Sequence, residues 1–161
     1  MNKEKSKVAF IKDITFLGFK LLRRMIRISE KALKRFKRRV RELTKRNNPL
    51  SMYRIIHELN KFLRGWVNYF RIQQFKRILR NLDEWIRGRL RSMQLKKWKN
   101  PRRFQHMMIL AGYKPEEAKK TWMRMNRWQS VQRKEAKFTM NLQWFRDREL
   151  IFLNDWTTCS S

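Results

Sequence analysis

The chain has 161 residues, of which 42 are lysine or arginine and 13 are aspartate or glutamate, so its formal net charge is +29 at pH 7. Hydrophobic residues make up 42% of the chain and aromatic residues 13%, which excludes wholesale disorder, because disordered basic chains are poor in large apolar side chains. The length fits one domain with at most a small appendage. Few metabolic enzymes of this length carry such a charge, and the partner that it predicts is nucleic acid.

Membrane insertion, secretion and metal binding find no support in the sequence. No run of about 18 apolar residues occurs, so no membrane span is expected, and the N-terminus lacks the apolar core of a signal peptide, which predicts a cytoplasmic protein. Cys159 is the single cysteine, which rules out an internal disulfide and a cysteine-based zinc site. Since His57 and His106 lack companion ligands at suitable spacing, we expect no metal and no cofactor.

The N-terminal part predicts a β-hairpin. Residues 16–21 and 25–28 are short runs rich in aromatic, aliphatic and β-branched side chains. Leu22, Arg23 and Arg24 separate the two runs, and such an arrangement is typical of two paired strands.

A helical period begins after Ser29, which we expect to be the N-cap. Apolar residues then recur at steps of three and four, at Leu33, Phe36, Val40 and Leu43. This spacing predicts an amphipathic helix, which should end at Pro49 or shortly before it.

Two longer helices are expected to follow, one capped by Ser51 and one over about residues 75–98. The stripe of the first comprises Met52, Ile55, Ile56, Leu59, Phe62, Leu63, Trp66 and Phe70, and that of the second Ile78, Leu79, Leu82, Trp85, Ile86, Leu90 and Met93. Gly65 lies inside the first of these helices at a cost of about 1 kcal/mol relative to alanine. We therefore expect another backbone or an RNA strand to approach closely there.

The remaining residues predict shorter helices. One should follow Pro101 and stop at Gly112, and another should start at Pro115. The predicted fold is mainly α, with a short N-terminal β-hairpin, a three-helix bundle and a smaller helical C-terminal extension. The predicted divisions are residues 1–28, 29–98 and 99–161.

The charged faces of these helices predict phosphate binding. Between Lys31 and Arg46 there are nine basic residues and one acidic residue, Glu42, so the carboxylates that a merely solvated face would carry are missing. The predicted phosphate contacts are Lys34, Lys37, Arg38, Arg41, Lys45, Arg64, Arg71, Arg87, Arg89 and Arg91. Trp66 and Trp85 fall on apolar stripes and should pack in the core. Tyr69 and Trp98 lie off the stripes and are the candidates for stacking on bases.

No residue pattern predicts catalysis. Asp83 and Glu84 are adjacent, and neighbouring side chains on a helix point about 100° apart, so they cannot converge on one ion. Pairing of either carboxylate with Arg80 or Arg87 is the expected alternative. The sequence has no glycine-rich phosphate loop and no nucleophile elbow.

The order of several segments resembles the C-terminal part of group II intron-encoded reverse transcriptases/maturases. The segments are Phe-Leu-Gly-Phe at 16–19, the basic helix at 29–47, Leu-Arg-Gly-Trp-Val-Asn-Tyr-Phe at 63–70, Leu-Asp-Glu-Trp-Ile-Arg at 82–87 and Lys-Lys-Trp-Lys at 96–99. The resemblance covers about residues 15–98. It implies that residues 16–19 are the last strand of the polymerase palm and that a three-helix thumb, also called domain X or the maturase-specific domain, follows.

In that family the thumb grips RNA, and the protein assists the folding and splicing of its group II intron while the RNA performs the transesterification. The resemblance thus implies structured intron RNA as the partner. The Tyr-x-Asp-Asp motif that holds the polymerase magnesium is absent, so we expect no reverse transcriptase activity from this chain alone.

Other hypotheses remain open. The chain could be the thumb of a split reverse transcriptase that needs a separate palm chain, or a decayed remnant without independent activity. A DNA-binding structural protein is a further alternative, although the sequence contains no recognisable DNA-reading motif.

Overall fold

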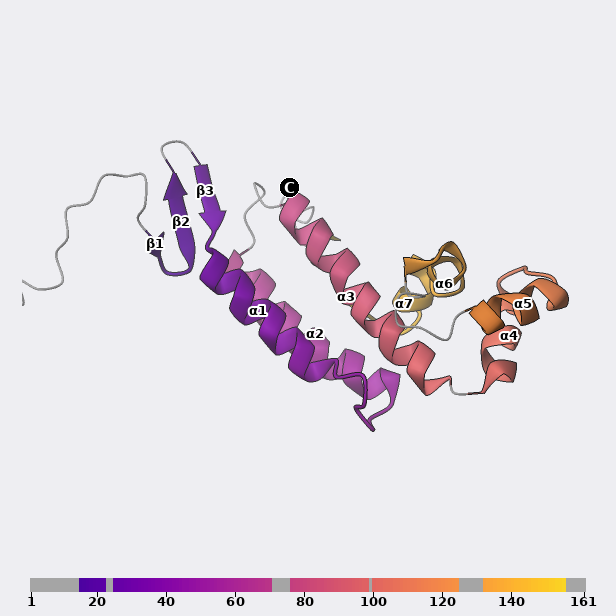
Figure 1. Cartoon of the computed structure of the whole chain (residues 1–161). Coiled ribbons are helices and arrows are strands. Elements are labelled where there is room, and N and C mark those ends of the chain that lie inside the picture. The colour runs from indigo at the N-terminus through magenta and orange to yellow at the C-terminus, as the bar shows by residue number, and fades with distance from the viewer. Residues whose placement is uncertain (1–14, 23–24, 71–75, 99, 125–131, 156–161) are drawn as a thin grey trace, which may run out of the picture.

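The structure, a computed structural model, describes residues 15–22, 25–70, 76–98, 100–124 and 132–155. Within these ranges the chain is mainly helical, with a small antiparallel sheet at its N-terminal side (Figure 1). The predicted fold class is therefore confirmed. None of the described helices is both long enough and apolar enough to cross a membrane.

The sheet has the strand order β1 (Thr15–Phe16), β2 (Phe19–Leu22) and β3 (Met25–Ile28), all antiparallel. Pairing of β2 with β3 confirms the predicted hairpin. The prediction that residues 16–19 form one strand is wrong, because Leu17 and Gly18 make a tight turn with φ values of +48° and +84°. A Cβ on Gly18 would lie 3.2 Å from the ring of Phe70, so both the backbone conformation and the packing favour glycine there.

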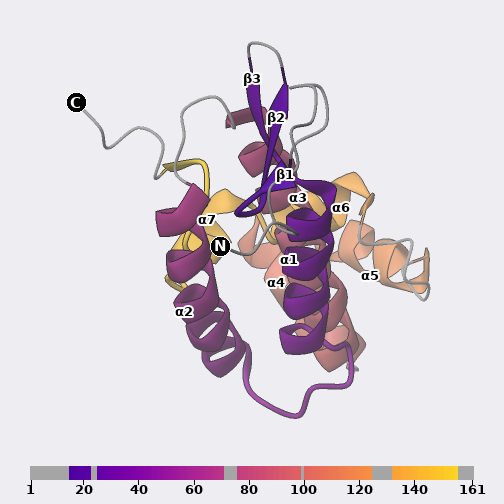
Figure 2. The ribbon, with the colours of Figure 1, turned by 90° about the vertical axis from the view of Figure 1, so that its left-hand side faces the viewer.

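Three long helices follow, α1 (Glu30–Leu43), α2 (Met52–Phe70) and α3 (Lys76–Lys97). Both predicted N-caps form, since Ser29 Oγ accepts a hydrogen bond from the Ala32 amide at 3.2 Å and Ser51 Oγ accepts one from the Arg54 amide at 3.3 Å. The loop between α1 and α2 turns the chain back on itself (Figure 2). The apolar stripes meet in one core, whose fully buried members include Phe36, Ile55, Ile56, Leu59, Leu63, Leu79, Ile86, Leu90 and Met93.

The C-terminal extension adds α4 (Pro101–Leu110), α5 (Pro115–Arg124), α6 (Lys134–Thr139) and α7 (Leu142–Arg146). The first two confirm the helices predicted around Pro101 and Pro115, and Gly112 ends α4 with a φ of +95°. Figure 1 shows α4 and α5 beyond the end of α3, while α6 and α7 lie beside α3.

Two polar side chains of the bundle hold the segment that follows α7. Asn60 of α2 donates to the Glu149 carbonyl at 2.6 Å and accepts from the Ile151 amide at 3.0 Å. Asp83 of α3 accepts from the Leu153 amide at 2.9 Å and from the Asn154 amide at 3.0 Å. These bonds, together with burial of Leu153, fix the extension to the bundle.

The predicted ion pairs of Asp83 and Glu84 are wrong. Asp83 is only 4% exposed and its carboxylate is used by backbone amides, while Glu84 pairs with Lys137 at 3.8 Å. The C-terminal segment covers Asp83 and supplies amide donors that the local sequence does not reveal. Burial raises the pKa of Asp83 to about 6, although its two amide bonds and the charge of Arg87 favour the ionised form.

The raised pKa of Asp83 predicts that this residue contributes more to the stability of the fold as the pH falls. The folded state binds a proton on Asp83 more tightly than the unfolded chain does, so this stabilisation is complete below the unfolded pKa near 4 and is lost as the pH rises through about 6. From pH 7 to pH 5 we expect the free energy of unfolding to rise by about 1 kcal/mol more in the wild type than in Asp83→Asn. Urea denaturation at each pH measures the difference, and parallel pH profiles would contradict it.

Candidate nucleic-acid interface

Helix α1 turns its apolar stripe to the core and its cations to the outside. Lys34, Arg38, Arg41 and Lys45 are exposed, and Lys37 is half-buried. Glu42 pairs with Arg39 at 3.2 Å and more loosely with Arg38 at 3.9 Å. Because these ion pairs are exposed, they contribute little stability and leave the basic face free to bind a polyanion.

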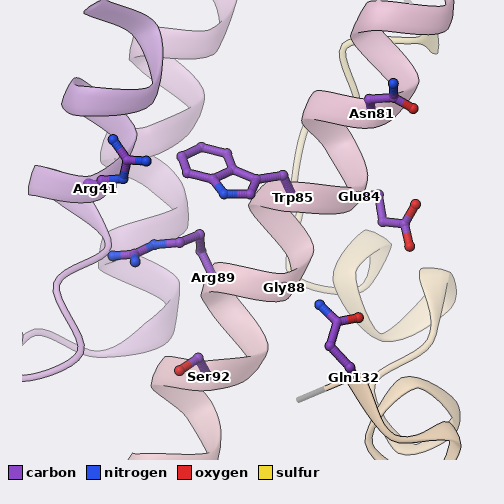
Figure 3. A pocket seen from close by; sticks show the side chains of 8 residues that line it. All are labelled: Arg41, Asn81, Glu84, Trp85, Gly88, Arg89, Ser92 and Gln132. Atoms are coloured by element: carbon purple, nitrogen blue, oxygen red, sulfur yellow. The ribbon is translucent and has the colours of Figure 1, made fainter. Parts of the chain in front are cut away.

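Trp85 of α3 lies under two of these cations. The Lys37 Nζ is 5.9 Å and the Arg41 Cζ 5.7 Å from the centroid of its ring, within the range of cation–π attraction. Trp85 packs against the core as predicted but remains partly exposed. Figure 3 shows its ring projecting from α3 toward α1, beside the side chains of Arg41 and Arg89.

Arg89 is held in place by the end of α1. It donates from Nε to the Thr44 hydroxyl at 3.2 Å and from Nη2 to the Thr44 carbonyl at 2.9 Å. Burial and the charge of Arg41 both lower the pKa of Arg89. Within the described ranges no carboxylate pairs with Arg41. Two neighbouring guanidinium groups, one of them fixed, make a favourable site for a phosphate.

A groove of about 520 Å³ runs along α3 at this point. It is lined by Arg41, Asn81, Glu84, Trp85, Gly88, Arg89, Ser92 and Gln132 (Figure 3). We call it the α1/α3 groove. Its floor is open at Gly88, where a Cβ would meet no atom within 4 Å. Gln132, which precedes α6, extends the lining to the C-terminal extension.

Gly65 is open as well, since a Cβ there would also meet no atom within 4 Å. The predicted close approach of another protein backbone is therefore absent from the part of the chain that the structure describes. Approach of an RNA strand at Gly65 stays a prediction.

The other predicted phosphate contacts differ in accessibility. Arg64 on α2 is exposed, whereas Arg87 is half-buried with its guanidinium 5.6 Å from the ring centroid of Phe152. Arg71 lies outside the described residues.

The predicted outward position of Arg91 is wrong. Its side chain is 6% exposed, donates to the Met140 carbonyl at 3.0 Å and lies 5.3 Å from the ring centroid of Phe145. The end of α6 and helix α7 cover this face of α3, and burial lowers the pKa of Arg91 to about 10. Arg91 anchors the extension and is not available to a phosphate.

The two candidates for base stacking, Trp98 and Tyr69, differ in how exposed their side chains are. Trp98, expected to be open, is 7% exposed and lies against Phe104 and Trp144, with ring centroids 6.0 and 6.5 Å away. The prediction fails because Trp98 faces the extension. Tyr69 is 52% exposed, and its hydroxyl donates to the Leu17 carbonyl at 2.6 Å.

Some residues of the interface were missed from the sequence. Thr44 positions Arg89 although it is 45 residues away in the chain, and Gln132 joins the groove from beyond α5. Neither has a local signal. Arg35 and Arg39 belong to the basic run of α1 and could have been chosen from composition alone.

Comparison with protein families supports the assignment. Residues 33–110 match the model of the maturase-specific domain of group II introns. The match runs from within α1 to the end of α4, and over these residues it confirms the resemblance found in the sequence. A domain of this kind indicates a function related to group II intron maturases. A search of curated proteins finds no match.

Within the described ranges no group of three or more histidine, cysteine, aspartate or glutamate side chains could hold a metal ion.

The open floor of the groove gives a prediction about stability. Gly88→Ala adds a methyl group to empty space in the middle of α3, so we expect the free energy of unfolding to rise by about 1 kcal/mol from helix propensity alone. Gly65→Ala on α2 should behave alike. Chemical denaturation of the three proteins measures this, and destabilisation by Gly88→Ala would show that the site is closed.

Proposed function

We propose that this chain is an RNA-binding maturase-type domain that binds structured group II intron RNA and assists its folding and splicing. The observation that carries the proposal is the Arg41–Trp85–Arg89 arrangement on the basic face of a maturase-specific domain. Its cations have too few acidic partners for a face that serves only solubility.

The proposed mechanism is electrostatic. Compact RNA brings phosphates close together, and lysines and arginines held on a rigid surface reduce their repulsion. A fixed guanidinium such as Arg89 loses little conformational entropy on binding. In this proposal the intron RNA performs the transesterification and the protein contributes no catalytic residue.

We expect tight, salt-dependent binding to group II intron RNA, and weaker binding to random duplex DNA. Arg41→Gln should weaken binding to the intron RNA and lower the slope of log Kd against log salt by about one unit. Filter binding across a salt series measures both effects.

The matched control is Arg54→Gln, since Arg54 is an exposed arginine in the first turn of α2 and does not line the α1/α3 groove. Its slope should change less than that of Arg41→Gln. Equal affinity for both nucleic acids, or a flat salt response, would contradict the proposal.

A splicing assay tests the biological role. With the matching intron transcript at a magnesium concentration too low for self-splicing, the protein should raise the splicing rate, because it replaces part of the charge screening that magnesium supplies. Arg41→Gln should raise it less. Stimulation that requires an added Tyr-x-Asp-Asp palm chain would favour the thumb of a split reverse transcriptase, and no stimulation in either case would favour a decayed remnant.

A further inference from the structure

We propose that a second groove, between α1 and α2, binds one unpaired base of the RNA. This inference rests on the proposed function but concerns a separate site. The groove has a volume of about 570 Å³, within the range of pockets that hold small organic groups, about 300–1,000 Å³. We call it the α1/α2 groove. It is lined by Leu17, Gly18, Ala32, Arg35, Phe36, Arg38, Arg39, Phe62, Trp66, Tyr69 and Phe70.

The floor of the α1/α2 groove is aromatic. Phe36 is almost fully buried, and its ring centroid lies 4.5 Å from that of Trp66 and 5.4 Å from that of Phe62. Trp66 and Phe62 are only partly buried, so both keep surface open to the groove. Bases of every kind stack on such rings, because each base has a π face.

The rim of the same groove is cationic. Arg35, Arg38 and Arg39 lie on one face of α1, at spacings of three and four residues, and line the groove. The acidic residue that pairs with them is Glu42, through Arg38 and Arg39. An apolar protein partner would gain little from three arginines around its site. A nucleotide combines an aromatic ring with a neighbouring phosphate, and it therefore matches both floor and rim.

The far wall of the groove is already ordered. The Tyr69 hydroxyl donates to the Leu17 carbonyl at 2.6 Å, and its ring stacks on Phe19 with the centroids 5.8 Å apart. The same turn packs Gly18 against Phe70. Binding a base here needs no rearrangement of this wall, which lowers the entropic cost of association.

The test uses a hairpin RNA with a single bulged adenine and a matched RNA with an abasic site at the bulge. We expect the wild type to bind the abasic RNA roughly tenfold more weakly, from the loss of one base–aromatic stack. A bulged 2-aminopurine should change its fluorescence when the protein binds. Trp66→Leu should bind the two RNAs almost equally.

Two further variants separate stacking from charge and folding. Because Trp66 also packs on Phe70, with centroids 4.7 Å apart, circular dichroism must show that Trp66→Leu is folded. The double variant Arg35→Gln/Arg39→Gln removes only exposed side chains. It should weaken binding to both RNAs and keep the preference for the adenine bulge. Lys119→Gln/Lys120→Gln on α5 is its charge-matched control and should weaken binding less.

The outcomes distinguish the two proposals. If the wild type binds both RNAs with equal affinity and 2-aminopurine gives no signal, the base site is refuted while RNA binding stands. If neither RNA binds, the proposed function itself fails. If added RNA leaves the residues of the α1/α2 groove accessible to solvent and only a separate palm chain covers them, the groove is a protein interface and the base site is wrong.

Discussion

Mutual repulsion among the lysines and arginines is the constraint under which this fold forms. A net charge of +29 opposes any compact state, and the described carboxylates offset only a little of it through exposed pairs. Folding therefore depends on each long helix having one apolar stripe that is complete enough to bury. Val40, Leu59 and Leu90, which are fully buried on three different helices, belong to the single core in which these stripes meet.

The same constraint explains where the polar bonds are placed. Those that hold the C-terminal extension use carbonyl and amide groups of the backbone, through Asn60, Asp83 and Arg91. Each of these side chains is buried, so each must be hydrogen-bonded to avoid a large desolvation cost. The extension consequently covers one face of α3 and leaves another face open. It removes Arg91 from the accessible basic surface and leaves the cations of α1 exposed.

Helix α1 lies between the two grooves that carry the proposals. On one side Lys37 and Arg41 lie over Trp85 of α3. On the other side Arg35 and Arg39 line the groove that contains Trp66 of α2. The two sides differ in kind, since the first brings two guanidinium groups together beside one indole ring and the second places arginines around several aromatic rings. A folded RNA offers both chemistries, phosphates along its backbone and bases in its bulges and loops.

The sequence by itself determined α1 to α5, both serine caps, the pairing of β2 with β3, the basic face of α1 and the resemblance to the maturase-specific domain. All of these follow from contacts between near neighbours in the chain or from composition, which periodicity records directly. Only the tertiary structure decided that Arg91 and Trp98 are buried, that Asp83 holds amides from residues 153 and 154, and that Thr44 fixes Arg89. Those outcomes depend on segments 45 to 71 residues apart. A helical pattern shows which residues share a face, but it does not show which later segment will cover that face.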